Sequence, residues 1–161
     1  MTPLELADRT VHVDRARRTD VPAIVALLAD DVLGRDREAP DLDPYLAAFD
    51  AVDADPAHLL AVVRDGDVVA GTVHLTFLPG LSRGGALRLQ VEAVRVAASH
   101  RGTGLGTAMI GWAVEHGRER GAVLVQLTTD KQRTDARRFY ERLGFVASHE
   151  GMKLALDQPG A

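Results

Sequence analysis

The chain of 161 residues contains no cysteine. This absence excludes disulfide bonds, thiolate metal sites and a cysteinyl acyl-enzyme, and it fits a reducing compartment such as the cytoplasm. No stretch approaches the roughly 18 apolar residues that a membrane-spanning helix needs. Residues 1–20 are charged throughout and lack the apolar core of a signal peptide. We therefore predict a cytoplasmic protein with no membrane partner.

An excess of positive charge is also missing. Lysine and arginine number 19 against 23 acidic residues, a formal net charge of −4, so no basic field indicates nucleic acid as a partner. The six histidines show no metal-ligand spacing, and we predict no metal. The length and the 46% content of hydrophobic residues suit one globular domain, which we expect to span residues 1–161.

The pattern of apolar and turn-forming residues predicts alternating strands and helices. A helix is expected through Ala29 after a cap at Thr19 or Asp20, and Asp65-Gly66-Asp67 is typical of a hairpin turn. Residues 30–43 and the glycine-bearing stretch 79–85 are expected to be loop and turn. The other predicted helices cover 44–52, 105–120 and 134–143, and the predicted strands cover 10–16, 59–64, 68–77, 86–96, 123–128, 145–147 and 152–156. This order favours an α/β or α+β fold around one mixed sheet.

The predicted strand 86–96 changes phase in the middle. Apolar residues occupy the odd positions from Leu87 to Ala93, and then Val94 and Val96 take the even positions. A regular strand cannot keep one apolar face through such a change, and one extra residue near Glu92 to Val94 would restore it. The pattern therefore predicts a β-bulge, a feature that tends to lie beside functional sites. The alternative is a strand buried on both faces.

A glycine-rich turn follows this strand and precedes a helix. Glycines 102, 104 and 106 allow unusual backbone conformations, the helix start offers unpaired N–H groups, and Arg101 adds a fixed positive charge. Together they predict a site for a diphosphate. Position 107 is threonine and the turn has no lysine, so neither the dinucleotide fingerprint nor the P-loop matches. The alternative is a tight, well-capped turn with no ligand.

Two motifs in order resemble one family. R-G-T-G-L-G at residues 101–106 is similar to the [Q/R]-x-x-G-x-[G/A] signature of the GNAT superfamily of N-acetyltransferases, and it follows a valine-rich strand end as in that family. A-R-R-F-Y-E-R-L-G-F at residues 136–145 resembles the family segment A-x-x-[LF]-Y-x-x-x-G-F. The resemblance implies a mostly antiparallel sheet of six or seven strands with about four helices, splayed centrally around acetyl-CoA.

The resemblance also implies which residues line the cofactor. Relatives often carry asparagine seven residues before the tyrosine, and here that position is Arg133, expected to contact a phosphate or an acidic acceptor. Arg133 and Lys131 are alternatively solvated charges at a helix start. The pantetheine arm would contact Ala93, Val94, Arg95 and Val96. The pyrophosphate would contact Arg101, Gly102, Thr103, Gly104, Leu105, Gly106 and Thr107.

Two residues are implied as catalytic. Tyr140 would protonate the departing thiolate, for which a phenol with a pKa of about 10 is suited. Glu92 would deprotonate the incoming amine directly or through a water, and a backbone N–H near Val94 would hold the oxyanion. The alternatives are a tyrosine packed through its ring and a solvated or ion-paired glutamate. His74 and His149 are candidates to face the acceptor pocket, whereas His116 is expected to be packed.

These features predict an N-acetyltransferase that moves an acetyl group from acetyl-CoA to a primary amine by direct attack in a ternary complex. A small-molecule acceptor is favoured, because the chain is acidic and shows no peptide-groove signature. The alternatives are an enzyme that acetylates protein lysines or N-termini, and a sensor that binds acyl-CoA without turnover. Homodimers are common in the family, so we also expect one here.

Overall fold

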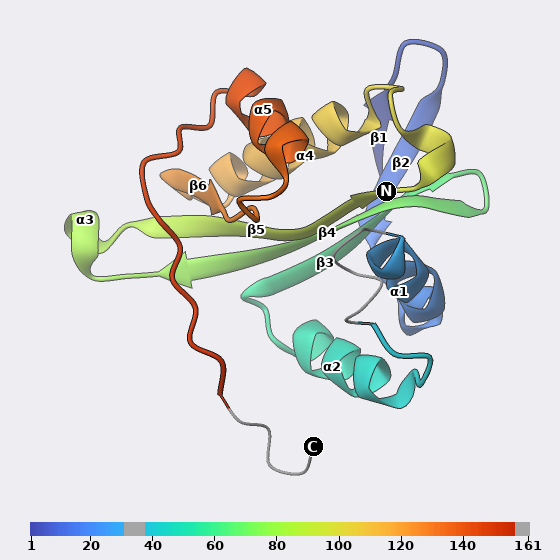
Figure 1. Ribbon diagram of the computed structural model, residues 1–161, viewed down its shortest axis with the longest axis horizontal. Coiled ribbons are helices and arrows are strands. Elements are labelled where there is room, and N and C mark those ends of the chain that lie inside the picture. The colour runs from blue at the N-terminus through green and yellow to red at the C-terminus, as the bar shows by residue number, and fades with distance from the viewer. Residues whose placement is uncertain (31–37, 157–161) are drawn as a thin grey trace. The chain divides into compact units, whose positions relative to one another are not determined.

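The structure is a computed structural model that describes residues 1–30 and 38–156 (Figure 1). The chain forms two compact units, residues 1–127 and residues 128–161, and each is described by itself. Part of the predicted loop 30–43 lies outside the described residues.

The first unit is built on one sheet of six strands in the order β1-β2-β3-β4-β5-β6. Neighbouring strands are antiparallel except for the parallel pair β5–β6, which confirms the mixed, mostly antiparallel sheet. Asp65-Gly66-Asp67 joins β3 to β4 as a hairpin, as predicted. The strands are β1 Thr2–Glu5, β2 Thr10–Arg15, β3 His58–Asp65, β4 Val68–Pro79, β5 Leu87–Val96 and β6 Leu124–Leu127.

Strand β1 was not among the predicted strands. It is four residues long and contains Pro3, which cannot donate a backbone hydrogen bond. β1 pairs only with β2 and forms one edge of the sheet, where proline is tolerated. Four residues that include a proline are too few to predict a strand from the sequence, because β1 depends on its pairing with β2.

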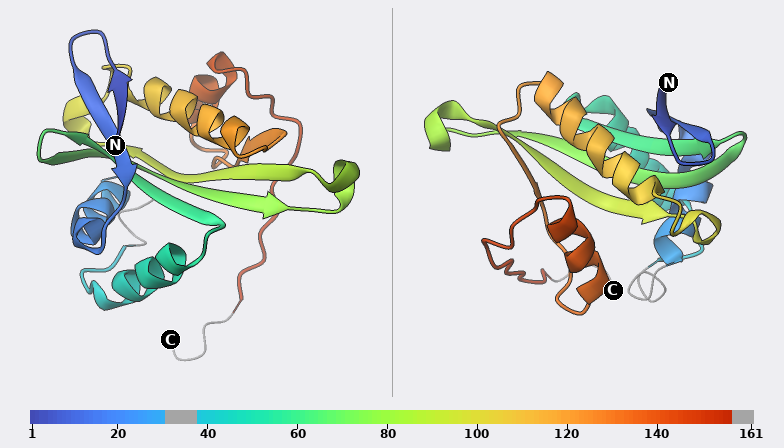
Figure 2. Two further views of the ribbon diagram at one scale, coloured as in Figure 1. Left: turned by 180° about the vertical axis from the view of Figure 1, so that it is seen from behind. Right: turned by 90° about the horizontal axis from the view of Figure 1, so that it is seen from above.

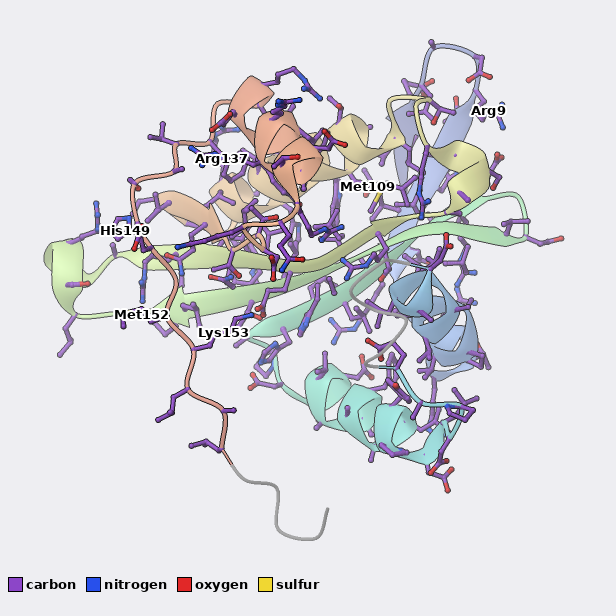
Figure 3. All side chains as sticks on the ribbon, viewed as in Figure 1. Arg9, Met109, Arg137, His149, Met152 and Lys153 are labelled. Atoms are coloured by element: carbon purple, nitrogen blue, oxygen red, sulfur yellow. The ribbon has the colours of Figure 1, made fainter. Side chains whose placement is uncertain are left out.

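Helices cover both faces of this sheet. α1 (Val21–Ala29) and α2 (Asp43–Ala54) lie on one face and α4 (Leu105–Glu119) lies on the other (Figures 1 and 2). The first face has a core of buried residues from β3, the two helices and the residue after β2. On the second face α4 buries a stripe with helical spacing, on which Met109 points to the sheet (Figure 3). The two sets are Ala16, Val21, Ile24, Val25, Phe49 and Val62, and Leu105, Met109, Ile110 and Ala113.

Three local expectations have more specific outcomes. Asp20 precedes α1, but its carboxylate makes no side-chain cap there: it binds Arg64 Nη2 at 2.7 Å and accepts a hydrogen bond from the Arg17 N–H at 2.8 Å. His116 is packed as expected, stacked on Trp112 with ring centroids 5.4 Å apart. The turn 79–85 contains the four-residue segment α3 (Ser82–Gly85), in which Arg83 and Gly84 have left-handed conformations with φ values of +57° and +70°.

The predicted bulge is present between β4 and β5. Thr72 lies opposite Arg95 and His74 lies opposite Glu92, so the single residue Val73 faces both Ala93 and Val94. Ala93 has a φ of +50°, in the left-handed region that residues with a side chain rarely adopt. The parallel pairing of β5 with β6 runs from Arg88 to Val91 and ends one residue before Glu92. The sheet therefore opens at the bulge.

The second unit contains the predicted helix, α5 (Thr134–Arg142). The helix ends in a Schellman motif: Phe145 N–H donates to Tyr140 C=O at 3.1 Å, and Gly144 N–H donates to Glu141 C=O at 3.0 Å. Gly144 has the required left-handed conformation, with a φ of +89°. The five-residue separation of Tyr140 and Phe145 in the second motif thus matches the hydrogen bond that closes the end of the helix.

The prediction of closing strands at 145–147 and 152–156 is wrong. The structure has no strand in either range, although apolar and other residues alternate from Met152 to Leu156 (Figure 3). A strand needs a partner for its backbone groups, and none of the described strands pairs with these residues. Their apolar side chains are exposed, for example 81% at Val146 and 96% at Met152.

The bulge predicts an unusual order of stability at position 93. Ala93→Val should lower the free energy of unfolding by about 1–3 kcal/mol, because a β-branched residue suits the left-handed region worst. Ala93→Gly should change it by less than about 1 kcal/mol, since relief of the backbone offsets the extra chain entropy of glycine. Urea denaturation measures both changes.

Leu78 supplies the control, because it is a half-buried position in the regular part of β4. There the valine variant should be more stable than the glycine variant, the usual order in a strand. If valine were also the better residue at position 93, the left-handed conformation of Ala93 would be contradicted.

Candidate functional site

The glycine-rich turn connects the end of β5 to α4 in the first unit. A short 3-10 helix, Ala98–His100, comes first, and Thr103 Oγ1 donates to the His100 carbonyl at 2.8 Å. Gly102 and Gly104 then take left-handed conformations with φ values of +80° and +88°. Gly104 is the N-cap of α4, and its carbonyl accepts the first helical bond, from Ala108 N–H at 3.0 Å. The backbone thus turns tightly into the helix.

The start of α4 has the properties of an anion site. The N–H groups of Leu105, Gly106 and Thr107 precede the first helical donor, so they have no partner within the helix. They lie at the positive end of the helix dipole. Most of the turn before them is exposed. This arrangement suits a diphosphate group.

Arg101 is engaged by the protein itself. Its Nη2 lies 2.8 Å from Asp30 Oδ2 and 3.0 Å from the Asp30 carbonyl, and its Nε donates to the Val96 carbonyl at 3.3 Å. The guanidinium therefore connects the end of α1 with the end of β5. An anion that binds Arg101 has to share it with Asp30 or displace that carboxylate.

A polar network of His100, Asp65 and Arg9 supports the glycine-rich turn. The sequence did not predict it. His100 is only 8% exposed, and its Nε2 lies 3.0 Å from Asp65 Oδ2. Asp65 also accepts from Arg9 Nη1 at 3.0 Å. The hydrogen bonds from His100 and Arg9 hold the pKa of the Asp65 carboxyl below its usual value. The hairpin β3–β4 thus fixes the residue just before Arg101, and no local motif connects residues so far apart in the sequence.

Glu92 lies beside the bulge and is exposed. Its cross-strand partner is His74, and both side chains share one face of the sheet because antiparallel partners point to the same side. Next to the bulge, residues 93–96 are half-buried, and Arg95 Nη1 donates to the Val94 carbonyl at 2.9 Å. A bulge leaves backbone groups of the extra residue outside the ladder, available to an extended ligand.

A second pair of side chains lies close to Glu92 on the same face. His74 Nε2 is 3.0 Å from Nδ1 of His58, on β3, and Thr76 Oγ1 is 3.1 Å from the same nitrogen. Burial lowers the pKa of His74 below its usual value, His58 lowers it further, and Glu92 opposes both effects. His74 was expected near the acceptor pocket; the role of His58 was not predicted.

The second unit contains the remaining candidates. The Tyr140 ring is half-buried between Phe139 and Phe145, at centroid distances of 5.1 and 5.7 Å. Arg133 is the N-cap of α5; its N–H donates to the Asp130 carbonyl at 3.0 Å. His149 is exposed, with its Nδ1 2.8 Å from Ser148 Oγ. The structure thus brings Glu92, residues 93–96 and residues 101–107 together in the first unit and describes Tyr140, Arg133 and His149 within the second.

Residues 1–30 and 38–156 contain neither a metal-binding cluster nor a membrane-spanning helix. No group of three or more histidine and carboxylate side chains in this part of the chain has the arrangement of a metal site. The helices of the same residues include none with the length and apolar character to cross a membrane.

Comparison with known proteins identifies the family. The model of the acetyltransferase (GNAT) family matches residues 22–145, which include both motifs. The chain is 33% identical over 110 residues to the aminoalkylphosphonate N-acetyltransferase of Salmonella typhimurium, covering 68% of this chain and 70% of that one. It is 36% identical over 88 residues to the glucosamine 6-phosphate N-acetyltransferase of Trypanosoma brucei brucei, covering 55% and 58%.

A solved structure extends the similarity to nearly the whole chain. The crystal structure of a transcriptional regulator from Bacillus halodurans C-125 is 44% identical, with a TM-score of 0.87, covering 91% of this chain and 99% of that one. The fold, the bulged strand, the turn before α4 and both motifs agree with the family match. The chain therefore belongs to the acetyltransferase (GNAT) family, as an acyl-CoA-dependent N-acetyltransferase.

Proposed function

We propose that the protein transfers an acetyl group from acetyl-CoA to the primary amine of a small molecule, by direct attack in a ternary complex. One observation carries the proposal: the bulge at Ala93 and the left-handed glycine turn before α4 lie in one segment, joined by the end of β5 and a short 3-10 helix. The first leaves strand backbone available to an extended arm, and the second offers unpaired N–H groups to a diphosphate.

The residues present fit this donor. Residues 93–96 would bind the pantetheine arm, the N–H groups of residues 102–107 would bind the pyrophosphate, and Arg101 and Arg133 would add positive charge. When bound, acetyl-CoA supplies an acetyl thioester. No cysteine is available to accept the acetyl group, which favours direct transfer to the amine.

Three groups of the chain would then act on the reaction. Glu92, exposed beside the bulge, would take a proton from the incoming ammonium, which cannot attack while protonated. The Val94 N–H would donate to the thioester oxygen as the amine attacks. The Tyr140 hydroxyl would return a proton to the leaving sulfur. The assignment of Tyr140 rests on the motif around it and on the helix end that fixes its backbone.

We further propose that both units form one acetyltransferase domain over residues 1–161. The family match supports this, because residues 22–145 include parts of both units. The cytoplasmic location and the homodimer stay predictions from the sequence.

The acceptor is proposed from chemistry and from relatives. The face beside Glu92 carries polar side chains from three strands, among them His74, Thr76 and Gln90. The Salmonella and Trypanosoma relatives are named for small amines that carry a phosphonate or a phosphate. We therefore propose a small polar amine in preference to a protein amine.

Release of free thiol from acetyl-CoA tests this proposal. We expect turnover with at least one member of a panel of aminoalkylphosphonates, amino sugars and their phosphates, and little with lysine-containing or N-terminal peptides. A preference for the peptides would overturn the small-molecule assignment.

A second candidate function is a sensor that binds acyl-CoA without turnover. The name of the Bacillus relative, a transcriptional regulator, is the observation that favours it. Calorimetry with acetyl-CoA separates the two: tight binding, together with no thiol release for any amine of the panel, would replace the enzyme by the sensor.

Tyr140→Phe should lower kcat by about 10²-fold, because general acid catalysis typically contributes that much or more. The other tyrosine of the chain is a matched control: Tyr45 on α2 is not part of the motif, and it donates its hydroxyl proton to Glu38 at 2.8 Å. Tyr45→Phe should leave kcat within about twofold of the wild type. An unchanged kcat in Tyr140→Phe would remove the phenol from the mechanism.

Arg101→Ala should mainly raise the KM for acetyl-CoA, by about tenfold, as expected for the loss of a charge-assisted phosphate contact. Arg18→Ala is the control, since Arg18 is an equally exposed arginine whose Nε lies 3.1 Å from an Asp50 carboxylate oxygen. Its KM for acetyl-CoA should not change. If Arg101→Ala raised only the KM for the amine, the turn would be misassigned.

A further inference from the structure

The most unusual arrangement outside the proposed cofactor site is a row of titratable side chains across three strands. Glu92 on β5 lies opposite His74 on β4, and His58 lies two residues further along the same sheet face on β3, opposite Thr76. Asp55 precedes β3, with Oδ2 3.9 Å from His58 Nε2. The row leads from the exposed Glu92 to a carboxylate that is 53% exposed at the far side of β3.

The distances allow the two imidazoles to share a proton. His58 Nδ1 lies within hydrogen-bond distance of two groups, His74 Nε2 at 3.0 Å and Thr76 Oγ1 at 3.1 Å. The relay uses the assignment in which His58 Nδ1 is an unprotonated acceptor, while His74 Nε2–H and the threonine hydroxyl donate to it. His58 then carries its proton on Nε2, the nitrogen nearest Asp55. The His74 ring has its acceptor nitrogen, Nδ1, left for another proton.

Burial and the neighbouring charges decide the protonation state of His74. Its surroundings disfavour the imidazolium, because burial and the neighbouring His58 both lower the pKa of His74. Glu92 favours the charged form and opposes them. Within the described residues, His58 and Glu92 are the titratable groups that act on His74 directly, Asp55 lies beside His58, and the cross-strand partner of His74 on β3 is Leu60. Near neutral pH His74 is therefore an uncharged base beside a carboxylate.

We propose that His74 and His58 relay to Asp55 and solvent the proton that Glu92 takes from the amine. The inference rests on the proposed role of Glu92. The ammonium N–H bond breaks and the proton joins the Glu92 carboxylate, then His74 Nδ1. The Nε2–H of His74 passes to His58 Nδ1, and the Nε2–H of His58 leaves to the Asp55 carboxylate or to water. One proton enters the row and one proton leaves it. Each step is a proton transfer, and no group is oxidised or reduced.

A relay through the sheet has a physical reason in a ternary complex. An acceptor bound beside Glu92 takes the place of the water that reaches this carboxylate in the free protein. A protonated Glu92 cannot serve as the base for the next amine, so its proton has to leave. The two histidines provide an exit on the protein side, toward the exposed end of β3.

The first test compares two acceptors that differ only in basicity: a small alkylamine that the wild type acetylates and a fluorinated analogue whose nitrogen is unprotonated at the assay pH. His74→Gln and His58→Gln should each lower kcat for the basic amine by about tenfold, a modest share of the usual acid–base contribution. With the fluorinated amine, the same variants should lose less than about twofold, because no proton has to leave before attack. His12→Gln, at a histidine on β2 that lies outside this row, is the matched control.

The outcomes separate the relay from the base. Equal losses of kcat with both amines would make the histidines structural and overturn the relay. A loss in Glu92→Gln, restricted to the basic amine, with no loss in either histidine variant would retain the base and overturn the relay. If Glu92→Gln kept full activity with both amines, the proposed base itself would fail, and with it the relay.

Nuclear magnetic resonance of the imidazole nitrogens gives a readout without turnover. We expect the His74 Nε2–H and His58 Nε2–H tautomers in the wild type. The His74 titration midpoint should move up in His58→Gln, where a repulsive neighbour is removed, and down in Glu92→Gln, where an attractive one is removed. Finding the proton on His58 Nδ1, or no change of the midpoint in either variant, would contradict the shared hydrogen bond.

Discussion

The register between β4 and β5 is the constraint on which the site depends. One residue of β4 faces two residues of β5 at the bulge, and the cost is a left-handed conformation at Ala93. Glu92 is the last residue before the irregularity and lies opposite His74, the pairing with β6 ends one residue earlier, and the half-buried residues 93–96 after it lead to the glycine turn. A regular strand would keep its ladder closed and would send the residues after position 92 to the opposite faces.

Sequence and structure agree best where the physics is local. The phase change within strand 86–96 predicted the bulge, because side-chain alternation is fixed by the backbone. The Asp-Gly turn predicted the hairpin, because its glycine takes a left-handed conformation, as Gly144 also does at the end of α5. Both motifs of the family resemblance are likewise short segments whose geometry is decided within a few residues.

The failures concern pairing over long distances. β1 forms only by pairing with β2, so its four residues did not predict a strand. Residues 152–156 alternate like a strand, but they have no strand partner in the described part of the chain, so the predicted strand is absent. The contacts His100–Asp65 and His58–His74 were not predicted for the same reason, since they join residues 35 and 16 positions apart in the sequence. A single sequence carries no signal for such pairs.

The contact between Arg101 and Asp30 has a consequence for the ionic-strength dependence of cofactor binding. In the free protein the guanidinium already has an anionic partner 2.8 Å away. A phosphate that takes over this arginine exchanges one anion for another, and the carboxylate released at the end of α1 then gains its own solvent ions. Added salt weakens both the old pair and the new one, so the net effect on affinity is smaller than for an arginine with no anion beside it. The ion pair thereby holds in place the charge that we propose for phosphate binding, and it reduces the sensitivity of that binding to added salt.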